Sequence, residues 1–120
     1  MTDIKPPPVK APITIDDLNR VDIRVGTIDR VEEMPKADKL VKLTVDFGDH
    51  KRTVLVGLAG ERSNPQEIEG VQALFVINLK PREMMGEVSE AMLFDVGYAD
   101  GIVPVLVTPQ SLVPNGTRVG

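Results

Sequence analysis

The chain has 120 residues and a mass of 13.1 kDa, which fits one domain. Its net charge of −4 argues against a basic protein that coats nucleic acid or binds anionic membranes without specificity. The chain has no cysteine and one histidine, so disulfides, thiol catalysis and zinc sites built on cysteines or histidine pairs are excluded, and we expect no cofactor. No apolar run is long enough to span a membrane, and the start lacks the pattern of a signal peptide, so we expect a cytoplasmic protein.

Residues 1–12 are predicted to be a flexible proline-rich leader, because Pro6, Pro7 and Pro8 favour an extended polyproline II segment. The folded domain is expected to span residues 13–120. Thr14, with Asp17 three residues later, predicts the capped start of a short helix.

The first strand is predicted from the alternation of Val21, Ile23 and Val25. After Gly26 the apolar positions change phase, which predicts a β-bulge or a sharp bend. A turn is expected at Pro35–Lys39.

Two more strands and a helix are predicted in the middle of the chain. Apolar residues alternate through 41–47, a turn follows at 48–50, and a third strand runs over 52–56. Asn64 followed by Pro65 predicts a helix start, and Gly70 ends that helix after barely two turns.

The last third of the chain is predicted to form strands and turns. Residues 71–79 are almost wholly apolar, which is typical of a strand buried on both faces. Further strands are expected at 89–96 and 102–107, with tight turns at 98–101 and 114–116. A short helix, three strands, a second short helix and then two or three strands is the order of a five-stranded OB-fold barrel, an all-β protein with short helices. A generic small barrel or sandwich is the alternative.

Catalytic constellations are not evident in the sequence. The paired carboxylates fall at predicted helix starts or turns, where solvated surface charge is expected, and His50 lies in a predicted hairpin turn. We therefore predict that the chain is not an enzyme.

A basic pair, Lys80 and Arg82, follows the buried strand, and Pro81 stiffens the turn between them. Asn78 and Ser89 would add an amide and a hydroxyl to the same rim of a barrel. Such a cluster suits the phosphates and 2′-hydroxyls of folded RNA. A β-turn with solvated cations is the alternative interpretation of these residues.

Three spaced blocks resemble the structure-specific tRNA-binding domain family: Val21–Gly26, Ala37–Leu40, and Asn78–Arg82 with Gly86 and Ser89–Leu93. This family includes the C-terminal dimerisation domain of bacterial methionyl-tRNA synthetases, free-standing tRNA-binding proteins, auxiliary proteins of eukaryotic synthetase complexes and CsaA-type chaperone-like proteins. The resemblance extends from about Ile13 to Val119.

This resemblance implies an OB barrel that homodimerises through extensions outside the barrel, here the helix near Thr14–Asn19 and the strands after Gly101. It implies that tRNA is recognised by shape at the outside of the L, without anticodon reading. The matched family positions associated with that surface are Arg24, Asn78, Lys80, Arg82 and Ser89. We add Lys39 and Arg52 as neighbouring cations.

The sequence departs from the family pattern at Glu83 and at Glu90, where many tRNA-binding members carry a basic residue and a glutamine. Together with Glu87, these acids place negative charge beside the basic rim and weaken its attraction for phosphate. Two alternatives stay open. One is a CsaA-like, export-related chaperone that holds unfolded polypeptide in an apolar groove, for which methionines are suited: Met34, Met84, Met85 and Met92. The other is a dimerisation or docking appendage of an aminoacyl-tRNA synthetase.

Overall fold

The computed structural model describes residues 5–35, 39–58 and 64–120. Residues 36–38, which belong to the predicted turn at Pro35–Lys39 and to the second of the three resembling blocks, lie outside the described residues.

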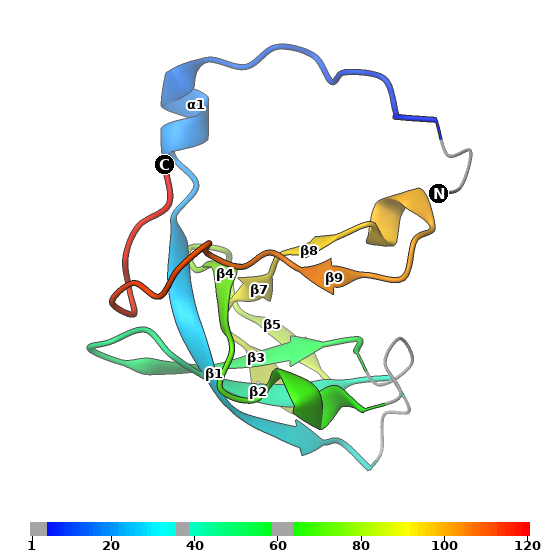
Figure 1. The fold of residues 1–120 in the computed structure, drawn as a ribbon, viewed down its shortest axis with the longest axis vertical. Coiled ribbons are helices and arrows are strands. Elements are labelled where there is room, and N and C mark those ends of the chain that lie inside the picture. Colours follow the sequence, from blue (N-terminus) through cyan, green and yellow to red (C-terminus); the bar gives the residue numbers. More distant parts are fainter. Residues whose placement is uncertain (1–4, 36–38, 59–63) are drawn as a thin grey trace.

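A five-stranded antiparallel sheet curls into a nearly closed barrel (Figure 1). Its strands follow the order β3-β2-β1-β4-β7, with bounds β1 Ile23–Glu33, β2 Val41–Asp46, β3 Lys51–Val56, β4 Gln72–Val76 and β7 Met92–Leu93. Strand β6 (Glu87–Ser89) packs against β3. The Glu90 amide donates to the Thr53 carbonyl at 2.8 Å and helps to close the barrel. The predicted all-β, OB-like barrel is confirmed.

Strand β1 serves both halves of the barrel because it changes partner along its length. Residues 23–27 pair with β4, and residues 27–33 pair with β2. The register shifts between Ile28 and Arg30, so the predicted bulge is confirmed but lies after Gly26. Gly26 has a separate role. A Cβ there would lie 2.6 Å from Val45 Cγ1 and 2.8 Å from the Phe47 ring, too close for either to stay in place.

The barrel is filled by aliphatic side chains. Strand β2 alternates between buried and half-buried residues, as predicted. The Phe47 and Phe75 rings meet edge to face in the core, with 5.4 Å between their centroids. The largest wholly buried side chains are those of Phe75, Ile28, Leu43, Val41, Val45 and Val54.

Several predicted elements differ from those observed. The predicted second helix is a four-residue 3₁₀ turn, η1 (Pro65–Ile68), and the Asn64 side chain makes no capping hydrogen bond. Strand β4 ends at Val76, three residues before the predicted end. The single strand predicted over 89–96 is divided among β6, β7 and β8 (Asp95–Val96), since the chain crosses from one neighbour to another at Glu90. Strand β9 (Val105–Leu106) is shorter than predicted and pairs with β8.

A hairpin that the sequence did not reveal joins β5 (Arg82–Met84) to β6. Its two turn residues, Met85 and Gly86, have φ values of +53° and +84°. Two positive φ values are the property of a type I′ turn, which matches the twist of the flanking strands.

The N-terminal helix precedes β1, and the C-terminal tail lies against β1. Helix α1 (Ile15–Asn19) carries the predicted capping box between Thr14 and Asp17, and none of its residues is buried. The predicted turn at 114–116 is present, and the tail after it is hydrogen-bonded to β1 through Val25 and Ile23. Figure 1 shows α1 and the leader standing away from the barrel. Over the described residues, no helix has both the length and the apolar character needed to cross a membrane.

Candidate nucleic-acid interface

Lys80 and Arg82 lie where the chain leaves β4 and enters the β5–β6 hairpin. Both side chains are exposed. Among the described residues, neither has a hydrogen-bond or ion-pair partner, so both charges are available to an anion. Both residues line the same pocket. The sequence analysis likewise expected these two cations on one rim of the barrel.

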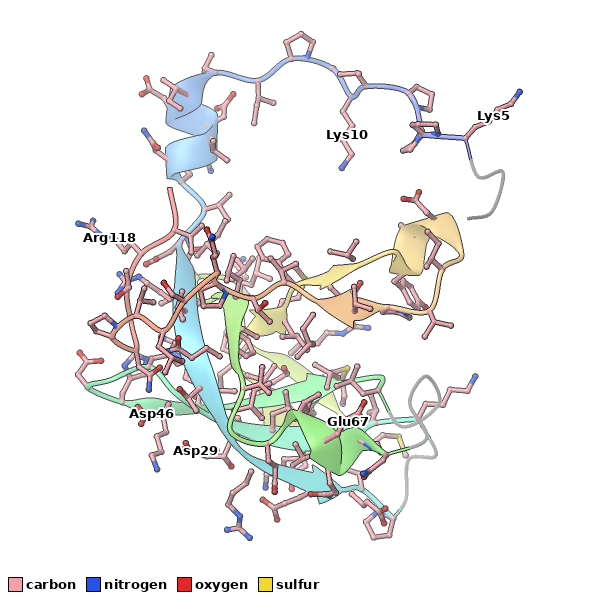
Figure 2. The ribbon with its side chains drawn as sticks, viewed as in Figure 1. Lys5, Lys10, Asp29, Asp46, Glu67 and Arg118 are labelled. Atoms are coloured by element: carbon pink, nitrogen blue, oxygen red, sulfur yellow. The ribbon has the colours of Figure 1, made fainter. Side chains whose placement is uncertain are left out.

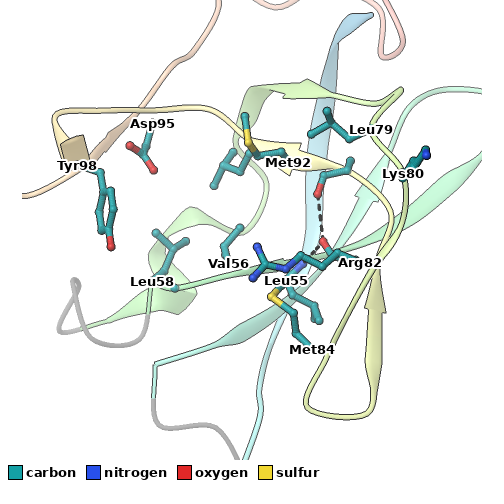
Figure 3. Close-up of a pocket in the computed structure, with 14 residues that line it drawn as sticks. Leu55, Val56, Leu58, Leu79, Lys80, Arg82, Met84, Met92, Asp95 and Tyr98 are labelled. Atoms are coloured by element: carbon teal, nitrogen blue, oxygen red, sulfur yellow. Dashed lines mark hydrogen bonds between the residues drawn. The ribbon is translucent and has the colours of Figure 1, made fainter. Parts of the chain in front are cut away.

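This pocket has a volume of about 500 Å³ and lies between the end of β3, the β5–β6 hairpin and β7 (Figure 3). Its floor is apolar and buried, formed by Leu55, Leu58, Ala91 and Leu93. We call it the rim pocket.

Ser89 lines the rim pocket, but its hydroxyl stabilises the barrel. Oγ accepts a hydrogen bond from the Leu55 amide and donates one to the Ala91 carbonyl, both at 3.0 Å. Figure 3 shows both bonds at the base of the pocket. Ser89 therefore ties β6 to β3, and its hydroxyl proton is already committed.

Asn78 and Arg24 line a second hollow of about 840 Å³ between α1 and the C-terminal tail. The Asn78 side chain bridges the chain that leads from α1 to β1: its Oδ1 accepts from the Asp22 amide at 2.8 Å, and its Nδ2 donates to the Arg20 carbonyl at 2.7 Å. The structure thus divides the predicted surface, with Asn78 and Arg24 in one hollow and Lys80, Arg82 and Ser89 in the other.

Arg24 is half-buried and bound to Asp22 through two guanidinium nitrogens, at 2.6 and 3.2 Å. A third nitrogen donates to the Gly116 carbonyl at 3.2 Å. The hydrogen bond to Asp22 is the main reason that the pKa of Arg24 is raised. Because Asp22 neutralises this guanidinium, Arg24 contributes less positive field than its position suggests.

Arg52 holds three parts of the barrel together. Its Nη1 donates to the Ile77 carbonyl at 2.8 Å and to the Glu90 carbonyl at 3.0 Å. Its Nε donates to Nε2 of His50 at 2.9 Å, and the His50 ring stacks on Phe47. On the other side of that ring, Nδ1 lies 2.6 Å from Asp49, and this contact lowers the pKa of Asp49.

Lys39 is exposed just before β2 and lines neither hollow. Conversely, sequence reasoning missed two cations. Arg20 and Arg118 join Arg24 at the second hollow, and Arg118 extends outward from the tail (Figure 2). The bridge between Arg24 and Arg118 joins residues far apart in the sequence, which local patterns do not reveal.

The acids beside the basic rim are largely engaged or turned away. Glu87 pairs with Lys42 at 3.4 Å, and the Glu90 carboxylate accepts from the Thr53 amide at 3.0 Å. Glu83 lies between Arg82 and Met84 on β5. Because side chains alternate along a strand, Arg82 and Met84 line the rim pocket and Glu83 does not. These three carboxylates therefore repel a phosphate bound at Lys80 and Arg82 less than three free carboxylates would.

Comparisons with known proteins identify relatives of this chain. Residues 23–118 match the family described as "Putative tRNA binding domain". The chain is 40% identical over 115 residues to the methionine–tRNA ligase of Parabacteroides distasonis, a match that covers 96% of this chain and 17% of the ligase. The chain thus spans about a sixth of the length of that curated relative.

Two solved structures have the same fold. A MetRS-related protein from Pyrococcus horikoshii superposes with a TM-score of 0.85 at 32% identity, over 92% of this chain and 100% of that one. The chaperone CsaA from Bacillus anthracis superposes with a TM-score of 0.77 at 29% identity, with the same coverage. The family match over residues 23–118 includes the five strands of the barrel and every described residue that lines the rim pocket. The chain therefore belongs to the tRNA-binding domain family.

Proposed function

We propose that this protein is a non-catalytic tRNA-binding module that holds phosphates with Lys80 and Arg82. The observation that carries the proposal is the pair of exposed cations at the mouth of the rim pocket, which have no ion-pair partner among the described residues, in a chain of the tRNA-binding domain family. Pro81 between them restricts the backbone, so less entropy is lost when the two cations bind an anion.

Recognition by shape is the mode that the composition favours. Tyr98 is the only tyrosine and there is no tryptophan, so the surface has no row of aromatic rings on which successive bases could stack. Folded RNA is then recognised through its phosphates and 2′-hydroxyls, and tRNA is the folded RNA to which the family points. This partner also implies a cytoplasmic location.

The test is a fluorescence-anisotropy titration of labelled bulk tRNA at several salt concentrations. Each phosphate neutralised adds about one unit to the slope of log affinity against log salt, so we expect about −2 for one protomer and about −4 for two. No binding at low salt with tens of micromolar protein would contradict the proposal.

We also propose that the protein works as a homodimer, assembled through α1 and the segment after Gly101, which contains β9. Ile15 and Leu18 are exposed on α1, and Val103 and Val105 are exposed on that segment. Exposed apolar side chains of this size are typical of a surface that another molecule covers. Two copies of Lys80 and Arg82 on one tRNA would raise the affinity by avidity.

Leu18→Asp tests the dimer, because a carboxylate that becomes buried in the proposed interface would have to be desolvated. We expect light scattering after size exclusion to give a dimer mass for wild type and a monomer mass for the variant. Val88→Asp is the matched control, since Val88 is an exposed apolar residue on the β5–β6 hairpin. A wild-type protein that elutes as a monomer at micromolar concentration would rule out the dimer.

A CsaA-like chaperone is the second candidate, favoured by the likeness to the Bacillus anthracis structure and by Met84 and Met92 in the rim pocket. It predicts that stoichiometric protein suppresses the aggregation of a thermally unfolded substrate; unchanged turbidity would count against it.

A synthetase appendage is the third candidate function, supported by the ligase match. It predicts co-elution of this protein with a catalytic synthetase chain.

A further inference from the structure

The rim pocket has three chemically different sides. The floor presents apolar atoms, because the one hydroxyl there, on Ser89, is bonded to Leu55 and Ala91. Figure 3 shows the two cations on one side of the pocket and an acceptor and an aromatic ring, Asp95 and Tyr98, on the other side. A ligand that fills the pocket would meet positive charge, a flat apolar surface and a hydrogen-bond acceptor in that order.

The cationic wall reaches into the pocket. Figure 3 shows the Arg82 guanidinium directed inward toward Val56 and Leu58, while Lys80 lies at the outer edge. Among the described residues, neither Arg82 nor Asp95 has an ion-pair partner. The pocket thus holds an unmatched cation and an unmatched carboxylate on separate walls, a separation that suits a ligand with an anionic group at one end and donors at the other.

Tyr98 stands beside Leu58 at the far wall (Figure 3). Tyr98 is 68% exposed, so burial in the core does not explain the position of the ring. It lies in the 3₁₀ turn η2 (Tyr98–Asp100), which is flanked by Gly97 and Gly101, both at positive φ. The ring can therefore cover a planar group that enters over the apolar floor.

We propose that the rim pocket binds one unpaired nucleotide of the RNA, with its phosphate on Arg82 and Lys80 and its base against Leu58 and Tyr98. This inference rests on the proposed function and names a ligand for the same site. RNA readers commonly take a single splayed base in this way, stacked on an aromatic ring and hydrogen-bonded on its Watson–Crick edge.

Asp95 makes the pocket selective among bases. A carboxylate accepts hydrogen bonds and donates none, so it prefers a base edge with adjacent donors. Guanine presents two neighbouring N–H donors on that edge, whereas the single N–H of uracil is flanked by two carbonyl oxygens. We expect guanine to bind most tightly and uracil most weakly.

The test uses Tyr98 as a built-in reporter. Since the chain has one tyrosine, 3-fluorotyrosine labelling gives a single ¹⁹F resonance, from this pocket alone. At millimolar concentrations we expect GMP to shift that resonance saturably and UMP to bind about tenfold more weakly, as one lost bidentate contact implies. Guanosine, which lacks the phosphate, and ribose 5-phosphate, which lacks the base, should each shift it less than GMP.

Three variants sharpen the result. Arg82→Ala should lower the affinity for GMP by about tenfold, the usual effect of losing one charge-assisted hydrogen bond. Asp95→Asn should narrow the preference for GMP over UMP, because an amide both donates and accepts. Arg30→Ala, which removes an exposed arginine on β1 outside the pocket, should leave both titrations unchanged.

A parallel anisotropy titration with tRNA separates this inference from the proposed function. If tRNA binds but neither tRNA nor GMP moves the ¹⁹F signal, the pocket inference is wrong and the function stands. If GMP shifts the signal saturably but tRNA does not bind, the inference stands and the function fails. If an acidic apolar peptide shifts the signal and no nucleotide does, the pocket is a peptide site and the inference is overturned.

Discussion

Arg52 is placed to stabilise the barrel through its guanidinium. Its hydrogen bonds reach the carbonyls that follow β4 and β6, so one side chain from β3 holds two other chain segments. Of its donor nitrogens, only Nη2 has no hydrogen-bond partner among the described residues. A cation near an RNA-binding surface can thus belong chiefly to the fold.

Arg52→Ala should therefore lower the free energy of unfolding by about 2 kcal/mol, since each carbonyl loses a hydrogen bond from a charged donor. Urea denaturation followed by circular dichroism measures this. Lys80→Ala is the control and should change stability by less than about 0.5 kcal/mol, because it removes an exposed side chain that has no partner in the described part of the chain. Equal stability of the two variants would mean that Arg52 does not hold the barrel.

Residue types alone could identify Lys80 and Arg82 but not the roles of their neighbours. The sequence places two cations around a proline after a buried strand, and the structure brings both to one pocket. The sequence does not reveal that Ser89 is hydrogen-bonded to Leu55, or Asn78 to Arg20. These partners are far apart in the sequence, and only the closed barrel brings them together. Polar side chains that bond distant backbone groups are difficult to distinguish from ligand contacts by pattern.

At the scale of elements, the β5–β6 hairpin positions the rim pocket. Alternation along β5 turns Arg82 and Met84 to the pocket and Glu83 to the other face. The hairpin depends on a turn in which Met85 has φ +53°, a left-handed conformation that is unfavourable for a side chain of this size.

Met85→Asn should stabilise the protein by about 1 kcal/mol, because asparagine tolerates the left-handed region better than methionine does. Thermal unfolding compared with wild type measures the gain. Met85 is exposed, so little burial is lost with its side chain. A lower melting temperature for the variant would show that Met85 makes contacts that outweigh the backbone strain.

Elements with strong periodicity were predictable, and those set by distant contacts were not. Strand β2 alternates cleanly, and the capping box of α1 is local in sequence. The region after Ser89 is a run of short strands because its backbone bonds to β3, β4 and β9 in succession, which no local pattern records. The 3₁₀ turn η1 is likewise set by packing, through the buried Ile68.

For the whole molecule, the two roles that were predicted for its surface meet where β8 pairs with β9. Asp95 of β8 lines the rim pocket, and the proposed dimer interface includes Val105 of β9, whereas the exposed apolar residues of α1 lie before the start of β1. The overall order of elements was enough to predict the barrel. The pairing of the tail with β1 was not predictable, although it brings Arg118 beside Arg24.

The central claim is that tRNA is held by Lys80 and Arg82, and not by the chain's general charge. The most direct test compares tRNA binding by wild type, Lys80→Ala/Arg82→Ala and Arg30→Ala/Lys10→Ala across a salt series. The two double variants lose the same charge, but the second pair lies outside the rim pocket. We predict that the first loses about 100-fold in affinity and about two units of salt slope per bound protomer, with the second within about threefold of wild type. Equal affinities for the two double variants would contradict the account.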